Sequence, residues 1–202
     1  MKLRKYFNLF LFGIIITSCN NSQRNKIENT AENLGDQIEH TFSKDYDEEI
    51  MINVPLNPKS NSQAKGNAVF TDKNGKVYLE VEMTGLTPHT KHAIHLHEKA
   101  DCGTDASADA ETAGGHWNPT SHAHGEWGEH SGYHQGDIGN LSTDKDGKAI
   151  LKFDTDQWCI NCADESKNIM FKSVVVHEGQ DDFKTQPTGG AGTRIACGVI
   201  VE

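Results

Sequence analysis

A histidine-rich stretch over Ala93–Asn140 constrains the fold of this chain more than any other feature, because it holds most of the 11 histidines. It begins with Ile94-His95-Leu96-His97, an alternation that places both imidazoles on one face of a β-strand. The following sequence is punctuated by Gly, Pro and Asn, as loops are, and contains further histidines and a carboxylate, among them His116, His124, His134 and Asp137. Imidazoles bind copper and zinc, and a carboxylate beside them suits zinc. The stretch therefore predicts a metal site built on one strand and the loops after it.

The sequence from about residue 49 onward has the length of one domain and the punctuation of an all-β protein. Asp72–Gly75 and Asp144–Gly147 are strong hairpin signals. No long segment has apolar residues at helical spacing, which favours a Greek-key barrel or sandwich over an α/β fold. Short runs typical of strands recur at Met51–Leu56, Gly66–Thr71, Lys76–Met83, Ala149–Phe153, Ser173–His177 and Ile195–Val201.

The N-terminal 18 residues have the pattern of an export signal. Basic residues precede an apolar run over residues 6–16, which is too short for a membrane-spanning helix. The run ends in Ile16-Thr17-Ser18-Cys19, which resembles the bacterial lipobox, where the cysteine becomes the lipidated first residue. An ordinary signal peptide with an incidental cysteine is the alternative. Lipid on Cys19 would hold the protein at a membrane surface without crossing it.

Residues 20–48 are rich in Asn, Glu, Asp, Gln and Ser and cannot bury enough apolar surface to fold. We therefore predict a signal peptide over 1–18, a flexible tether over 19–48 that starts at lipidated Cys19, and one domain over 49–202. This organisation predicts an exported, membrane-anchored lipoprotein in the periplasm or at the outer membrane. The residues after Cys19 do not distinguish which membrane carries it.

Charge and cysteine content narrow the class of protein further. The formal net charge is −10 at pH 7, which argues against nucleic acid as a partner. With Cys19 assigned to lipid, an even set of cysteines remains: Cys102, Cys159, Cys162 and Cys197. In an exported chain this set suggests two disulfides.

A series of motifs across the domain matches the copper/zinc superoxide dismutase family in the family's order. They are HLH at 95–97, GGHWNP at 114–119, HG at 124–125, HQGDIGN at 134–140, VVHE at 175–178 and GGAGTRIACGVI at 189–200. The resemblance implies an eight-stranded Greek-key β-barrel with long metal-binding and electrostatic loops. It also implies an enzyme that converts superoxide to dioxygen and hydrogen peroxide. The oligomeric state, monomer or homodimer, stays open.

The resemblance assigns the metal ligands by motif. It implies a copper site of His95, His97, His116 and His177, and a zinc site of His116, His124, His134 and Asp137. His116 then bridges the two ions and delivers a proton to the developing peroxide as copper alternates between its two oxidation states, while zinc is structural. Arg194, at the family's Gly-x-Arg position, attracts the anionic substrate through its permanent charge.

Further assignments follow from the same resemblance. Asp181 matches a carboxylate that accepts hydrogen bonds from a copper histidine and a zinc histidine, with the adjacent Asp182 as the alternative. The family's disulfide corresponds to Cys102 and Cys197. His92 matches a histidine of the barrel wall, and His122 is an alternative to His124 in the zinc set. The histidines that we expect to be solvated are His40, His89, His122 and His130.

The chain also departs from the family pattern. The pair Cys159-x-x-Cys162 has no counterpart, and three interpretations stay open: a local second disulfide, a metal-loading site or a redox pair. The loop before Arg194 contains a single cation, Lys184, against the acidic Glu178, Asp181 and Asp182. Steering of superoxide then rests on local focusing of the anion, is weaker than in the family, or comes from lysines elsewhere. The alternative function is a copper- and zinc-buffering protein of the same fold with little turnover; the complete ligand set and Arg194 favour the enzyme.

Overall fold

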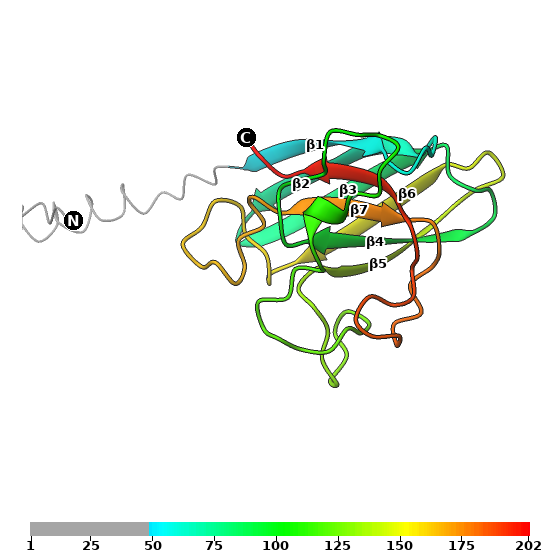
Figure 1. The fold of residues 1–202 in the computed structure, drawn as a ribbon. Helices are drawn as coiled ribbons and strands as arrows, with labels where there is room; N and C mark the ends of the chain where they lie inside the picture. The colour runs from blue at the N-terminus through cyan, green and yellow to red at the C-terminus, as the bar shows by residue number, and fades with distance from the viewer. Residues whose placement is uncertain (1–48) are drawn as a thin grey trace, which may run out of the picture. The chain divides into compact units, whose positions relative to one another are not determined.

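The computed structural model describes residues 49–202, and the predicted signal peptide, Cys19 and tether lie outside them. Eight antiparallel strands curl into a nearly closed barrel in the order β5-β4-β7-β8-β1-β2-β3-β6 (Figure 1). This confirms the all-β, eight-stranded prediction. No helix within residues 49–202 is long and apolar enough to cross a membrane. The elements are β1 (Ile50–Pro58), β2 (Lys65–Lys73), β3 (Lys76–Thr84), β4 (Lys91–His97), the 3-10 helix η1 (Glu111–Ala113), β5 (Asp137–Ser142), β6 (Ala149–Thr155), β7 (Ser173–His177) and β8 (Arg194–Val199).

The two predicted hairpin turns have different surroundings. Asn74 and Gly75 join β2 to β3 with φ angles of 54° and 72°, and the two strands pair directly on either side of them. Asp144–Gly147 instead joins β5 to β6, which stand at opposite ends of the strand order. The hairpin prediction is therefore confirmed for Asp72–Gly75 and wrong for Asp144–Gly147, which is a turn between two strands that do not pair.

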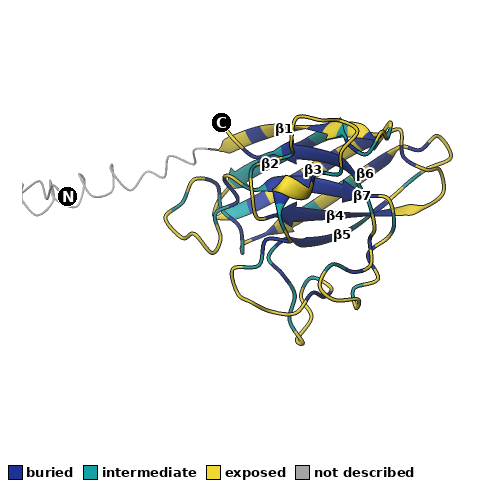
Figure 2. Ribbon diagram, in the orientation of Figure 1, coloured by how far each residue is buried: buried dark blue, intermediate teal, exposed yellow. Residues whose placement is uncertain are grey.

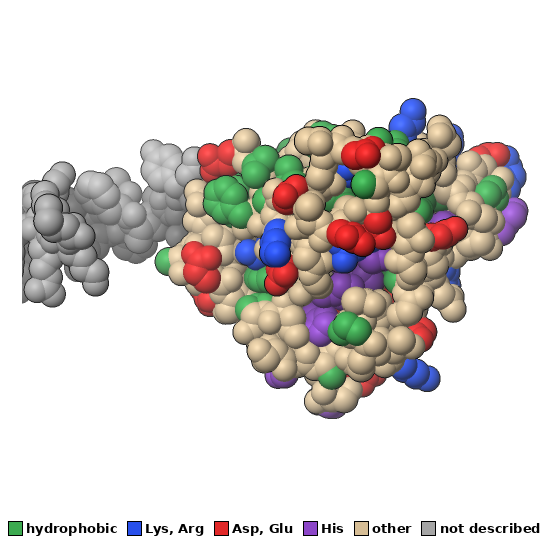
Figure 3. Space-filling view, viewed as in Figure 1, with side chains coloured by type: hydrophobic (Ala, Val, Ile, Leu, Met, Phe, Trp, Pro, Cys, Tyr) green, Lys and Arg blue, Asp and Glu red, His purple; other side chains and the backbone are tan. Residues whose placement is uncertain are grey.

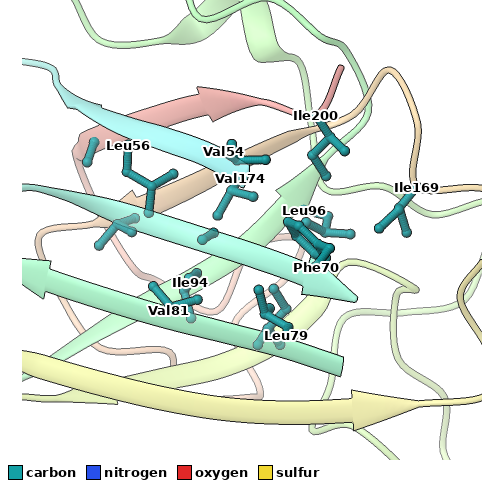
Figure 4. Packing of buried hydrophobic residues seen from close by; sticks show 14 of the residues in the cluster. Val54, Leu56, Phe70, Leu79, Val81, Ile94, Leu96, Ile169, Val174 and Ile200 are labelled. Atoms are coloured by element: carbon teal, nitrogen blue, oxygen red, sulfur yellow. The ribbon is translucent and has the colours of Figure 1, made fainter. Parts of the chain in front are cut away.

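The core of the barrel is filled by the inward side of each strand. In β3, buried and exposed residues alternate, so Val77, Leu79, Val81 and Met83 face inward. Apolar side chains from both halves of the sheet meet there, including Val54, Phe70, Leu96 and Val174 (Figure 4). Figure 2 shows β4 and β7 buried along nearly their whole length, exposed and buried residues alternating on β1, and many exposed residues in the connecting loops.

The strand β4 is buried on both faces, and this determines where a site can form. Ile94 and Leu96 belong to the barrel core, so the alternating residues His95 and His97 face the outside of the sheet. Both are fully buried, because the long loops after β4 and after β7 lie on the same side of the barrel and cover them (Figure 1). The outer face of β4 under these loops is therefore the candidate site.

Candidate metal centre

Two clusters of buried donor groups lie under the loops. The ligand atoms within each cluster all lie within 4.8 Å of one another. His116 belongs to both clusters. The first consists of His95, His97, His116 and His177, and the second of His116, His124, His134 and Asp137. The structure thus brings together the residues that the sequence motifs assigned to copper and to zinc.

The strands position most of the first cluster. His95 and His97 lie on β4, and the neighbouring strand β7 ends at His177. The register between the two strands pairs His97 with Ser173 and Ile94 with Val176. The last residue of β7, His177, therefore lies near His95. His116 lies in the loop, but it forms an isolated β-bridge with His97. Backbone pairing therefore fixes the geometry of this cluster.

Hydrogen bonds fix which nitrogen of each ring carries the proton. Three rings in the first cluster donate to an oxygen that can only accept: His95 Nε2 to Asp181 Oδ2 (2.8 Å), His97 Nδ1 to Gly114 O (2.9 Å) and His177 Nδ1 to Gly192 O (3.1 Å). The opposite nitrogen of each ring is therefore a bare lone pair. These nitrogens, together with His116 Nε2, are buried without a hydrogen-bond partner among residues 49–202.

His92 provides a contrast within the same strand. Its ring is 1% exposed, yet both nitrogens have partners: Nδ1 lies 3.0 Å from His177 O, and Nε2 lies 3.0 Å from Thr90 Oγ1. His92 thus belongs to the wall of the barrel, as its motif position implied. His89, His122 and His130 are exposed, and His40 lies outside the described residues. Burial alone does not produce a free ring nitrogen.

The second cluster is centred on the carboxylate of Asp137. Oδ1 lies 2.8 Å from His116 Nδ1 and 3.3 Å from His134 Nδ1, and Oδ2 lies 3.0 Å from His124 Nδ1. The backbone N–H of His134 also donates to Oδ2, at 2.8 Å. Asp137 is the first residue of β5, a strand that sequence reasoning treated as loop, so one end of this cluster is tied to the sheet.

The residues of the two clusters fit copper and zinc. Each buried polar atom without a partner costs about 1–3 kcal/mol, and several such nitrogens converge in one place, which a bound cation explains. The first cluster offers only imidazole, which copper accepts in both oxidation states. The second offers three imidazoles and a carboxylate, the mixed set that zinc binds tetrahedrally.

The pKa values agree with this division of the two clusters. Burial lowers the pKa of His116 to about 4 and that of His177 to about 3, so both rings are neutral at pH 7 and able to coordinate. Burial also disfavours the charged form of His124, but the carboxylates of Asp137 and Asp181 outweigh it and raise the pKa of His124 to about 9. Asp137 and Asp181 thus favour positive charge in the second cluster, as they would for a bound cation.

Asp181 connects the two clusters. Its carboxylate accepts hydrogen bonds from His95 Nε2 (2.8 Å) and His124 Nε2 (2.9 Å), and the residue is 3% exposed. A side chain at Gly189 would collide with this carboxylate, and the φ of Gly189 is 70°. Asp182 is exposed and accepts from Thr185 in its own turn. The bridging position is therefore occupied by Asp181.

Sequence reasoning missed two residues that hold the loops together. Asn140 exchanges hydrogen bonds with the backbone of Asp181: Asn140 Nδ2 donates to Asp181 O at 3.0 Å, and Asp181 N donates to Asn140 Oδ1 at 2.8 Å. Gln186 forms the equivalent pair with the backbone of His124: Gln186 Nε2 donates to His124 O at 2.8 Å, and His124 N donates to Gln186 Oε1 at 2.9 Å. Asn140 lay inside a family motif that could have drawn attention to it. No sequence signal marked Gln186.

Arg194 lies at the edge of the first cluster. As the first residue of β8, it pairs with His177. Its guanidinium donates to Ala110 O (2.6 Å) and Gly114 O (2.8 Å), and its Nε lies 3.8 Å from Asp109 Oδ1. The side chain remains 19% exposed. Figure 3 shows histidine side chains reaching the surface of the domain, with basic and acidic side chains beside them.

Both cysteine pairs form disulfides. The bond between Cys102 and Cys197 joins residues 95 apart and ties the loop that receives the Arg194 side chain to β8. Cys159 and Cys162 form the second disulfide, within the loop between β6 and β7. Of the three interpretations of this pair, the structure contains the local disulfide.

Comparison with known proteins agrees with the geometry. The chain is 34% identical over 139 residues to Superoxide dismutase (Cu-Zn) 2 of Aquifex aeolicus, covering 67% of this chain and 78% of that protein. It is 37% identical over 148 residues to the Extracellular superoxide dismutase (Cu-Zn) of Drosophila melanogaster, covering 69% and 77%. A solved structure of a SOD-like protein from Bacillus subtilis superposes with a TM-score of 0.65 at 27% identity, covering 74% and 97%.

A family model provides the most direct assignment. The model described as Copper/zinc superoxide dismutase (SODC) matches residues 64–200, which include both clusters, Arg194 and the Cys102–Cys197 disulfide. The match covers more than half of the chain. This chain belongs to the copper/zinc superoxide dismutase family.

Proposed function

We propose that this enzyme is a superoxide dismutase that binds copper through one cluster and zinc through the other. The proposed copper ligands are His95, His97, His116 and His177, and the proposed zinc ligands are His116, His124, His134 and Asp137. The observation that carries the proposal is the convergence of bare, buried ring nitrogens beside Arg194. Bound copper supplies one-electron oxidation and reduction, and bound zinc is redox-inert.

Each chain residue then has a defined task in the conversion of two superoxide ions and two protons to dioxygen and hydrogen peroxide. The acceptors Gly114 O, Gly192 O and Asp181 keep the ring protons away from the metal-facing nitrogens. The guanidinium of Arg194, fixed by two backbone carbonyls, attracts the anion and orients it. His116 Nε2 is buried in the first cluster and can hold a proton that is needed by the product.

Metal analysis of residues 49–202, combined with a dismutation assay, tests this proposal. We expect equimolar copper and zinc and rapid dismutation in the parent, and loss of activity in His116→Ala. The matched control is His122→Ala, since His122 lies in the same loop but is exposed; it should retain both metals and full activity. A parent that binds both metals without dismutating superoxide would refute the enzyme and favour the metal-buffering alternative.

We also propose that the protein is exported and anchored by lipid on Cys19, in the periplasm or at the outer membrane. Two disulfides in the domain support export, and the sequence before Cys19 supports lipidation. Cys19→Ser in the full chain should move the protein from the membrane fraction to the soluble fraction and abolish labelling by a fatty acid. Unchanged membrane association in that variant would contradict the anchor.

A further inference from the structure

The loop between β6 and β7, which carries the Cys159–Cys162 pair, packs against the loop that carries the second cluster. Trp158, directly before the Cys159–Cys162 disulfide, is 1% exposed. Its ring meets that of Trp127 edge to face, with the centroids 5.7 Å apart, and it lies 5.1 Å from Phe153 of the barrel. Trp127 stands between His124 and His134 in the sequence. The aromatic contact thus joins the two loops.

Polar contacts from the same loop reach both neighbours of His134. The indole N–H of Trp158 donates to Gln135 O at 2.9 Å. The side-chain amide of Gln157 contacts the hydroxyl of Tyr133, with its nitrogen at 2.8 Å and its oxygen at 3.1 Å. The residues directly before and after His134 are therefore both held by residues 157 and 158.

The barrel holds the other side of this short segment. Gly136 N donates to Trp117 O at 2.9 Å, and Leu96 N donates to Gly136 O at 2.9 Å. A Cβ on Gly136 would collide with the backbone of Leu96. The turn from His134 to Asp137 thus lies between the barrel and the Trp158 loop. The contacts with the barrel come from its wall, whereas the contacts with the Trp158 loop come from residues that belong to neither cluster.

The Trp158 loop is itself well fixed. Besides its disulfide, Cys159 N donates to Lys167 O (2.9 Å) and Ile169 N donates to Cys159 O (3.1 Å). Asp72, at the end of β2, accepts from Ile160 N at 3.0 Å. A fixed loop can hold its neighbour in place, whereas a mobile one cannot.

We propose that Trp158 and Gln157 are positioning residues for the zinc site, which slow the loss of zinc by holding His134 and Asp137 in their binding geometry. The inference rests on the proposed function, because it takes the second cluster to be the zinc site. The loop that carries the Cys159–Cys162 disulfide supplies no ligand to either cluster. The proposal gives this loop a role in retaining zinc. Partners outside the ligand set commonly change metal affinity by about 10- to 100-fold when they act on a ligand directly.

Zinc release from the fully metallated protein to a chromophoric chelator tests the proposal, with copper content followed in the same samples. Trp158→Phe keeps an aromatic ring and removes the N–H; we expect zinc release about fivefold faster, the factor that corresponds to one hydrogen bond. Tyr133→Phe is the milder second variant, which removes only the hydroxyl, and should accelerate release by a smaller factor. Copper should stay bound in both.

Val54→Ala is the control, because Val54 is fully buried on β1 and makes a cavity in the core when truncated. It should lower thermal stability without accelerating zinc release. The proposal fails if the two loop variants release zinc at the parental rate, or if Val54→Ala accelerates release as much as Trp158→Phe, since zinc retention would then follow global stability. A parent that binds no zinc would overturn the proposed function and this inference together.

Discussion

The two metal clusters share one histidine but are built in different ways. The first cluster, proposed to bind copper and called the copper cluster below, draws His95, His97 and His177 from adjacent paired strands, so its geometry follows from the closure of the barrel. The second cluster, proposed to bind zinc and called the zinc cluster below, draws His124 and His134 from a long loop that side chains hold in place, among them Asp181 and Gln186. A site on strands inherits the rigidity of the sheet, whereas a site on a loop needs its own supports.

Single ligand variants offer the largest test of this contrast. In His177→Ala, copper should be lost and dismutation should fall to background, while zinc stays bound because its cluster does not contain His177. In His134→Ala, zinc should be lost and copper largely retained, because the strands still hold the copper ligands. Metal analysis and the dismutation rate measure both. Loss of both metals from each variant would show that the two clusters form one cooperative unit.

The two disulfides should contribute unequally to stability. Closing a loop of about 100 residues stabilises by about 4.7 kcal/mol in the chain-entropy model, and closing one of a few residues by about 2 kcal/mol. The Cys102–Cys197 bond spans 95 residues and the Cys159–Cys162 bond only 3. Denaturant unfolding of the two double serine variants measures the difference. Equal losses of stability would contradict the entropic account and point to a stronger local role of the short bridge.

Asp181→Asn examines the link between the clusters. The amide keeps the size of the side chain but loses the charge that accepts from both His95 and His124. We expect zinc affinity to fall by about 10- to 100-fold, and copper affinity by less, because the strands orient His95 independently. Competition with chelators measures both affinities. Asp182→Asn is the matched control, since its side chain is exposed and touches neither cluster; an equal effect there would refute the bridging role.

Acid should destabilise the metal-free domain through the copper cluster. In the folded protein His116 and His177 stay neutral down to pH values of about 4 and 3, whereas in the unfolded chain they take up protons near 6.5. The unfolded state binds more protons between these limits, so the free energy of unfolding falls as pH drops from 7. His124 acts oppositely: with its pKa raised to about 9, its contribution is complete below 6.5 and is lost as pH rises through 9.

Thermal unfolding of metal-stripped protein measures this pH dependence. We expect a melting temperature several degrees lower at about pH 4.5 than at pH 7. A melting temperature that does not change would show that the copper-side histidines are solvated without metal.

The smallest expected effect is that of salt on the dismutation rate. Salt screens charges over about 10 Å at 0.1 M, and Arg194 is the cation beside the copper cluster, so the rate should fall as ionic strength rises. Arg194→Ala should keep both metals, lower the rate roughly tenfold and flatten the salt dependence. A parental rate that stays flat or rises with salt would contradict local focusing of the anion. Loss of metal from Arg194→Ala would assign the arginine a structural role.

Much of the fold could be predicted from the sequence because alternating strands leave a local signature. The runs at Lys76–Met83 and Ser173–His177 became β3 and β7 with bounds close to those predicted. β5 was not recognised, because Gly139 and Asn140 conceal its strand character. The turn at Asp144–Gly147 was recognised, but a turn motif does not specify whether its two strands pair.

The supports of the site could not be predicted, for a different reason. The side chain of Gln186 binds the backbone of His124, 62 positions away, and that of Trp158 binds the backbone of Gln135, 23 positions away. Every residue possesses such backbone groups. Side-chain identity therefore carries little information about these contacts. Motif resemblance named the candidate ligands and Asp181, whereas the network that orients them became visible only in three dimensions.

The carbonyl oxygen of Gly114 has a consequence for how this enzyme can change over evolution. It accepts from His97 Nδ1 (2.9 Å) and from Arg194 Nη2 (2.8 Å), so one peptide group orients both a proposed copper ligand and the residue proposed to attract the anion. A shift of this peptide would displace the hydrogen-bond acceptor of both side chains at once. We therefore expect substitutions that change anion attraction without disturbing His97 to fall at residues around Arg194 that do not contact this carbonyl.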